Sequence, residues 1–150
     1  MVNLSTLREM LTYCRPAGSA TERAFIDRYI ATLPGAYQDV YSNWHVSVSD
    51  APILWSCHTD TVHHKAGRQQ VITHNGRLSL SAGSGKVSRC LGGDDTVGVY
   101  LCREMVLAKV PGHYIFHYGE EKGCIGSALL AEECPEWLRT FNAAIAFDRA

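Results

Sequence analysis

Two stretches near the start of the chain carry apolar residues at helical spacing. They cover residues 4–13 and 20–33, and we expect a helix over each. Ser19 or Thr21 can cap the second stretch, and a Pro-Gly pair directly follows it. The chain is therefore predicted to begin with two helices.

From Tyr37 the spacing changes to one typical of strands. Valines stand among polar residues at positions 40, 46 and 48. Three short apolar runs also predict strands, because each is too short for a buried helix and is flanked by polar or turn-forming residues: 52–57, 114–118 and 143–147.

The remaining segments predict two more helices and one surface excursion. Residues 63–85 are polar and contain glycine, which predicts a hairpin or an excursion over the surface. A helical pattern follows Thr96 and is expected to end before Pro111. Another helix is predicted over residues 127–133, stopped by Pro135.

Helices that alternate with buried strands predict an α/β fold. We expect a three-layer α/β/α sandwich with a mixed, largely parallel sheet. A chain of 150 residues with 46% hydrophobic side chains can build one sizeable core, so residues 1–150 are predicted to form a single domain.

Composition argues against several classes of partner. Lys and Arg total 14 against 15 for Asp and Glu, and no basic stripe is present that would neutralise a nucleic-acid backbone. No apolar run approaches the ~20 residues that span a bilayer, so no membrane association is expected. The six cysteines form no C-x-x-C pair, which favours reduced, mostly structural thiols and a cytoplasmic protein.

Metal-ligand side chains recur where predicted strands end. The carboxyl ends of strands in an open α/β sheet form the crevice in which ligands bind. So many acidic groups at one edge would repel one another strongly unless a cation lay between them. These side chains are His58 and Asp60 after one strand, Glu120 and Glu121 after a second, Asp148 after a third, and Asp94 and Asp95 at the start of a helix.

Each of these residues also has an ordinary structural interpretation. Asp94 can be a helix cap, His58 and Asp60 can be structural polar residues, and the acidic side chains at 120 and 121 can be solvated charge. Asp148 can belong to a polar terminus. A metal site explains all of them together, whereas the ordinary interpretation requires several independent coincidences.

Four motifs in register resemble the co-catalytic zinc exopeptidase superfamily, which includes peptidase T, glutamate carboxypeptidase, aminoacylase and zinc aminopeptidases. The similarity extends from about residue 39 to the end of the chain. The motifs are His58-Thr-Asp60-Thr-Val62, Gly92-Gly-Asp94-Asp-Thr-Val-Gly98, Gly119-Glu120-Glu121-Lys-Gly123 with Gly126, and Phe147-Asp148.

The resemblance implies a ligand set for zinc, present as one or two ions, with cobalt or manganese as alternatives. His58 and Asp148 would hold one ion, and Asp94 would bridge to a second ion that Glu121 also holds. Imidazole and carboxylate groups are the ligands that zinc takes in catalytic sites.

The resemblance also implies two supporting roles. Asp60 would accept a hydrogen bond from the far ring nitrogen of His58 and fix its tautomer. Glu120 would be the general base that takes a proton from the attacking water and passes it to the leaving amine.

The chain departs from the family pattern at the last metal ligand. In the family, a histidine beyond the final aspartate completes the second metal site. We expect that this chain is truncated before that histidine and that it lacks a lid or dimerisation domain. Five other histidines could substitute but are expected to be surface or core residues: His63, His64, His74, His113 and His117.

The predicted function is hydrolysis of a terminal peptide bond by a zinc-dependent exopeptidase of the aminopeptidase or carboxypeptidase type. The alternatives are an N-acyl amino acid deacylase that uses the same residues, and a truncated, non-catalytic metal-binding relative. The expected partner is a peptide or N-acyl amino acid substrate, and a homo-oligomer stays open.

Overall fold

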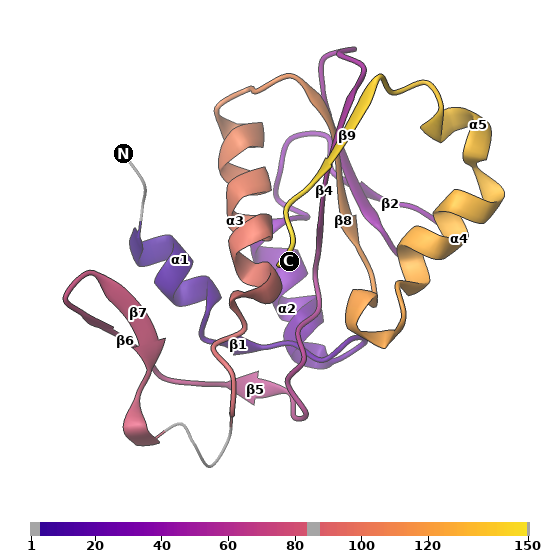
Figure 1. Cartoon of the computed structure of the whole chain (residues 1–150). Coiled ribbons are helices and arrows are strands. Elements are labelled where there is room, and N and C mark those ends of the chain that lie inside the picture. Colours follow the sequence, from indigo (N-terminus) through magenta and orange to yellow (C-terminus); the bar gives the residue numbers. More distant parts are fainter. Residues whose placement is uncertain (1–3, 84–87, 150) are drawn as a thin grey trace.

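A computed structural model describes residues 4–83 and 88–149 (Figure 1). Its helices are α1 (Leu4–Met10), α2 (Ala20–Tyr29), α3 (Gly93–Leu107), α4 (Ile125–Glu133) and α5 (Pro135–Leu138), with a 3-10 turn, η2, at Glu120–Lys122. Its strands are β1 (Tyr13–Cys14), β2 (Tyr37–Gln38), β3 (Trp44–Val48), β4 (Ile53–His58), β5 (Gly67–Arg68), β6 (Val71–His74), β7 (Arg77–Leu80), β8 (Gly112–His117) and β9 (Ala143–Ala146).

The main sheet has five strands in the order β2-β3-β8-β4-β9. β4 runs parallel to both of its neighbours, β8 and β9. β3 is antiparallel to β8 and to β2, so four of the five strands share one direction. The predicted α/β fold with a mixed sheet is confirmed, and β4 lies between the two strands whose ends carry the acidic motifs.

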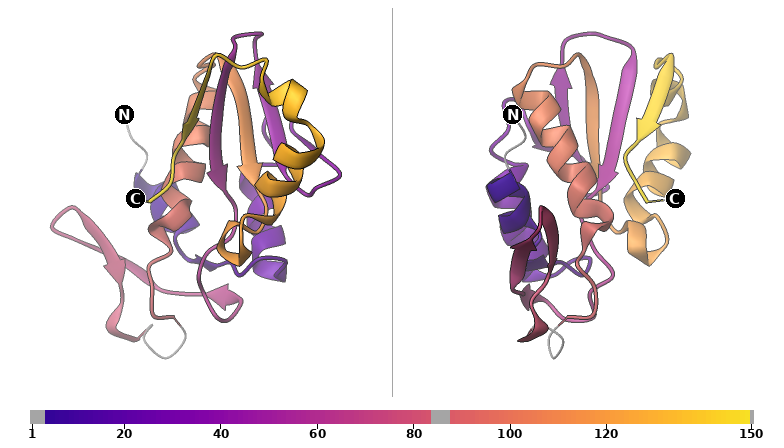
Figure 2. Two further views of the ribbon diagram at one scale, coloured as in Figure 1. Left: turned by 45° about the vertical axis from the view of Figure 1, so that its right-hand side comes forward. Right: turned by 60° about the vertical axis from the view of Figure 1, so that its left-hand side comes forward.

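Helices cover both faces of this sheet (Figure 2). On one face, α1, α2 and α3 pack through residues such as Phe25 and Val99 against Tyr114 and Phe116 of β8. On the other face, α4 and α5 cover Leu54, Ile115 and their neighbours. Successive strand residues therefore point to opposite cores, which explains why these strands appear as continuous apolar runs in the sequence.

The predicted surface excursion is a hairpin. β6 and β7 pair antiparallel around a turn at Asn75 and Gly76, both with positive φ. The predicted boundary at Gly85 lies outside the described residues. A short pairing of β1 with β5 connects this region to the end of α1.

Several predicted boundaries were wrong. The first two helices end at Met10 and Tyr29 rather than at residues 13 and 33, and Ser19 rather than Thr21 caps α2, accepting a hydrogen bond from the backbone N–H of Glu22 at 3.1 Å. Tertiary pairing explains the first difference, because Tyr13 is drawn into a strand against β5.

Two residues have local roles that their sequence context obscured. Val40 lies in the turn between β2 and β3 and is 89% exposed, so it is not a strand residue. Pro135 not only follows α4 but begins α5, where the missing proline N–H costs nothing at the first helical position.

Two further features concern the chain as a whole. Among the described residues, no helix is both long and apolar enough to cross a membrane. All six cysteines are free thiols, and three of them, Cys14, Cys57 and Cys102, are buried.

Candidate metal centre

The sheet order brings the three acidic strand ends to one edge. His58 is the last residue of β4 and pairs in register with His117, the last residue of β8. The backbone turns sharply after β8 and places Glu120 and Glu121 in η2. On the other side of β4, Asp148 follows the end of β9 by two residues.

The Nε2 atom of His58 is the centre of the cluster. It lies 3.0 Å from Asp94 Oδ1, 3.8 Å from Glu120 Oε2 and 3.8 Å from Asp148 Oδ1. Two groups of three residues have ligand atoms that lie within 4.8 Å of one another inside the group. One group is His58, Asp94 and Asp148, and the other is His58, Glu120 and Glu121. The structure thus gathers all the residues predicted as metal ligands, together with Glu120.

Asp60 connects the two motifs that flank it in space. Its side chain is fully buried and lies 3.3 Å from His58 Nδ1. Its two carboxylate oxygens accept hydrogen bonds from the backbone N–H groups of Glu120 and Glu121, at 3.0 and 3.1 Å. The sequence suggested only its contact with the histidine, whereas Asp60 also fixes the turn that carries both glutamates.

Asp95 is a second buried anchor, for which the sequence predicted no separate role. It accepts hydrogen bonds from the backbone N–H groups of His58 at 3.1 Å and Gly98 at 2.9 Å. Asp94 and Asp95 have non-helical backbone angles at the start of α3, and the peptide bond between them is cis. Through its contact with His58 Nε2, Asp94 faces the cluster, while Asp95 holds α3 against β4 through its two hydrogen bonds.

Asn43 supports the turn that carries Glu120 and Glu121 by bonding to residues on either side of it. Its buried side-chain amide donates to Gly126 O at 3.0 Å and to Asp39 Oδ2 at 2.9 Å. Its Oδ1 atom accepts from the backbone N–H of Tyr118 at 3.2 Å. The sequence signal was weak, because the segment 39–43 carries no metal-ligand pattern.

Arg15 was not identified from the sequence at all. Its guanidinium is fully buried and donates to Thr59 O at 2.8 Å and to Thr96 Oγ1 at 2.9 Å. It also lies over the ring of Phe25, 3.8 Å from the centroid. It links the loop after β4 to the start of α3, a long-range role that leaves no local pattern.

The charges in this edge perturb one another strongly. Burial alone would lower the pKa of His58, but hydrogen bonding to Asp60 and the charges of Asp95 and Asp60 outweigh it and raise that pKa to about 9. Burial raises the pKa of Asp95 to about 7. Burial, followed by the charge of Asp94, also raises the pKa of Glu121. Without a cation, Asp95 and Glu121 thus resist ionisation.

A divalent ion fits this set of donors. The Oε1 atom of Glu121 is buried without a hydrogen-bond partner in the described structure, which is costly for a polar atom unless a ligand satisfies it. Imidazole and carboxylate groups are both ligands that zinc takes. The Asp60 contact with His58 Nδ1 leaves Nε2 to face such an ion.

The other histidines do not join the cluster. Within the described ranges, neither set of ligand atoms includes any of the five. His63 is buried and bonded to Thr61, and burial lowers the pKa of His117 to about 4. His113 bonds to His45, and His64 and His74 are exposed. The expectation that they are core or surface residues is consistent with these positions.

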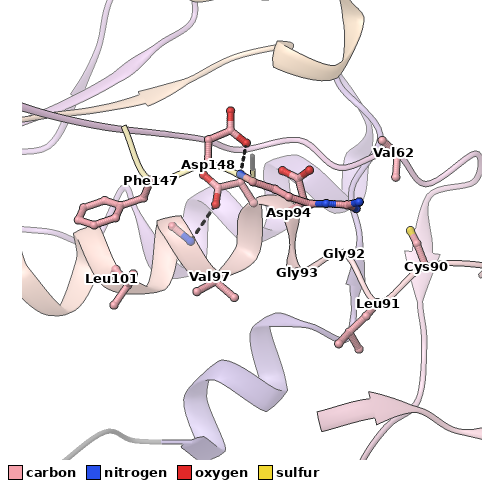
Figure 3. Close-up of a pocket in the computed structure, with 13 residues that line it drawn as sticks. Val62, Cys90, Leu91, Gly92, Gly93, Asp94, Val97, Leu101, Phe147 and Asp148 are labelled. Atoms are coloured by element: carbon pink, nitrogen blue, oxygen red, sulfur yellow. Dashed lines mark hydrogen bonds between the residues drawn. The ribbon is translucent and has the colours of Figure 1, made fainter. Parts of the chain in front are cut away.

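Two hollows flank the cluster. The larger, of about 570 Å³, lies beside the start of α3, and Asp94 and Asp148 form part of its wall (Figure 3). The smaller, of about 230 Å³, is lined by His58, Glu120 and Asp148 together with Cys124 and Ser127 at the start of α4. A substrate group at the cluster would therefore have space on both sides.

Comparison with known proteins gives similarity in structure only. No family model matches the chain, and no curated protein matches its sequence. A tripeptidase from Staphylococcus aureus matches with a TM-score of 0.69 and 23% identity, over 98% of this chain and 43% of the tripeptidase.

Two other solved structures show the same fold. An aminoacylhistidine dipeptidase from Vibrio alginolyticus matches with a TM-score of 0.57 and 12% identity, over 83% of this chain and 29% of its own. An aminopeptidase from the archaeon Desulfurococcus kamchatkensis matches with a TM-score of 0.56 and 15% identity, over 97% and 63%. This chain thus spans less than half of the tripeptidase and of the dipeptidase. The family resemblance seen in the sequence is confirmed at the level of the fold, which is that of these peptidases.

Proposed function

We propose that this chain is the metal-binding core of a zinc-dependent exopeptidase that hydrolyses a terminal peptide bond. The observation that carries the proposal is the convergence of His58 Nε2 with the carboxylates of Asp94, Glu120 and Asp148 at the carboxyl edge of a peptidase-like sheet. Deacylation of an N-acyl amino acid is the alternative, because the same groups would act on that amide.

The proposed ligands follow from the geometry and the donor types. His58, Asp94 and Asp148, whose ligand atoms lie within 4.8 Å of one another, would hold one ion. The family resemblance implies that Asp94 and Glu121 would hold a second. A divalent ion in this position supplies Lewis-acid polarisation of the scissile carbonyl. The unpartnered Oε1 of Glu121 supports its role as a ligand.

Asp60 and Glu120 would act through hydrogen bonds and proton transfer. Asp60 holds the imidazole of His58 and, through two backbone N–H groups, the turn that carries Glu120. The Glu120 side chain is 32% exposed and lines the smaller hollow, so water and the leaving amine can reach it. Glu120 would take a proton from the attacking water and transfer it to that amine.

The position of Glu120 admits a competing role as a ligand, because its carboxylate groups with those of His58 and Glu121. Glu120→Gln separates the two roles. If Glu120 is the general base, this variant should lose at least a hundredfold in turnover while its zinc content per chain stays unchanged. A ligand predicts loss of zinc together with activity, and Glu132→Gln on the exposed face of α4 is the matched control.

The proposed activity is tested with the purified chain, zinc, short peptides and N-acyl amino acids. Chelator-sensitive release of a free amine is the expected result, and the preferred substrate class decides between exopeptidase and deacylase. Stoichiometric zinc binding without turnover on either class would instead favour a non-catalytic metal-binding protein.

A further inference from the structure

The larger hollow beside the cluster is lined by apolar side chains that the proposed chemistry does not use. Val97 and Leu101 belong to α3, and Phe147 is the residue that follows β9 (Figure 3). Val62, Cys90 and Leu91 line it as well. Large apolar side chains exposed together in a cavity of about 570 Å³ are typical of ligand pockets.

The exposure of these side chains is high for their type. Val62 is 51% exposed, Val97 41% and Leu101 39%. Other large apolar side chains, such as Leu4 and Ile72, are exposed to a similar degree, but these three share one hollow. Covering them with an apolar group would remove apolar surface from water, which stabilises a complex. Their surface is therefore suited to an apolar ligand group.

The charges around this pocket restrict what it can hold. Asp94 and Asp148 stand at the cluster, where a metal ion would engage them, and Asp95 is buried and bonded to backbone N–H groups. Arg149 is the remaining charged residue of the lining and follows Asp148 directly. A neutral apolar ligand side chain meets Val97 and Leu101, whereas an acidic one would have to pair with Arg149, which is exposed to solvent.

The proposed proton transfer indicates which side of the scissile bond each hollow serves. Glu120 lines the smaller hollow and not the larger, while Asp148 lines both. A group that protonates the leaving amine must lie on the amine side of the scissile bond. The larger pocket then lies on the carbonyl side.

We propose that this pocket binds a large apolar side chain of the substrate residue that contributes the scissile carbonyl, so that the substrates are peptides with a residue such as leucine or phenylalanine at that position. This inference rests on the proposed function. It adds a specificity that neither the metal ligands nor the fold determines.

Amino acid hydroxamates test the proposal by binding, independently of turnover. Their hydroxamate group coordinates zinc in place of the scissile carbonyl, so their side chain must enter the carbonyl-side pocket. Titration calorimetry of the zinc-loaded chain is expected to show leucine hydroxamate binding about tenfold or more tightly than glycine hydroxamate. Aspartate hydroxamate is expected to bind more weakly than the leucine compound.

Two variants of α3 locate the effect. Leu101→Ala is expected to reduce the preference for leucine over glycine hydroxamate several-fold. Leu107→Ala is the matched control, because Leu107 is 48% exposed on the same helix but does not line the pocket. Neither side chain belongs to a buried core, since Leu101 is 39% and Leu107 48% exposed, so neither change should unfold the protein.

The outcomes separate the pocket from the metal chemistry. If the chain binds zinc and all hydroxamates with equal affinity, or if Leu101→Ala leaves the preference unchanged, the pocket proposal is wrong and the proposed function stands. If the chain binds no zinc in a preceding titration, the proposed function fails and the pocket proposal with it. If sedimentation shows a dimer that Leu101→Ala dissociates, the apolar surface is an interface between copies, which also overturns the proposal.

Discussion

Replacing Gly98 by alanine should destabilise this protein, although the same change usually stabilises a helix. Gly98 lies inside α3, where alanine is favoured over glycine by about 1 kcal/mol. A Cβ atom at this position would lie only 2.3 Å from Asp95 Oδ1 and 2.6 Å from Asp95 Cγ. The carboxylate would have to move.

That movement is costly because Asp95 is 3% exposed and doubly anchored. Displacing it lengthens its hydrogen bonds to the backbone N–H groups of His58 and Gly98. Overpacking in a tight interior costs about 1–3 kcal/mol, and each weakened charge-assisted bond adds to that. After subtracting the helix preference, we expect a net loss of about 2–3 kcal/mol in the free energy of unfolding.

Thermal unfolding followed by circular dichroism measures this change. For a chain of this length, the expected loss corresponds to a Tm lower by about 4–12 °C. Gly93→Ala is the control, because a Cβ there meets nothing within 4 Å, and its Tm should stay close to that of the wild type. In an Asp95→Ser background, the penalty for Gly98→Ala should largely disappear. A Gly98→Ala protein as stable as the wild type would refute the reasoning.

Three further predictions concern the buried charges. Asp60→Ala should lower the free energy of unfolding by about 2–4 kcal/mol, measured in urea titrations, because the backbone N–H groups of Glu120 and Glu121 lose their acceptor. It should also lower the affinity for zinc about 10- to 100-fold, because His58 loses the carboxylate 3.3 Å from its Nδ1 atom. Burial lowers the pKa of His113 to about 4 from an ordinary 6.5, so the folded state binds fewer protons than the unfolded state between these pH values. Stability should therefore fall as the pH drops from 6.5 towards 4, and His113→Gln should reduce that fall by up to about 3 kcal/mol; an equal fall in the variant would contradict the assignment. Zinc at a hundred times its Kd should raise the free energy of unfolding by about 2.7 kcal/mol, and a chelator should reverse it; an unchanged Tm would argue against a metal site.

The sequence predicted best those elements whose local pattern and tertiary position agree. β4, β8 and β9 are short apolar runs, and all three occur where the pattern placed them. Because each run was followed by metal-ligand side chains, the gathering of His58, Glu121 and Asp148 could be anticipated from strand direction alone. Their roles in binding and catalysis stay predictions.

The parts that escaped prediction depend on contacts between distant segments. Tyr13 was assigned to a helix because its strand pairing partner, Arg68, lies 55 residues further along the chain. Arg15 and Asn43 are fully buried polar residues with partners far away in sequence. A local pattern contains no information on such partners, so neither residue could be identified as a support of the site.

Asp60 binds two neighbouring backbone N–H groups with one carboxylate, which makes opening of this edge of the sheet cooperative. Asp60 follows β4, while the N–H groups that it binds belong to the turn after β8. Separating the two segments would release both groups at once. The amide protons of Glu120 and Glu121 should consequently exchange with deuterated solvent at matched rates, and the two side chains would leave the cluster in a single event rather than one after the other.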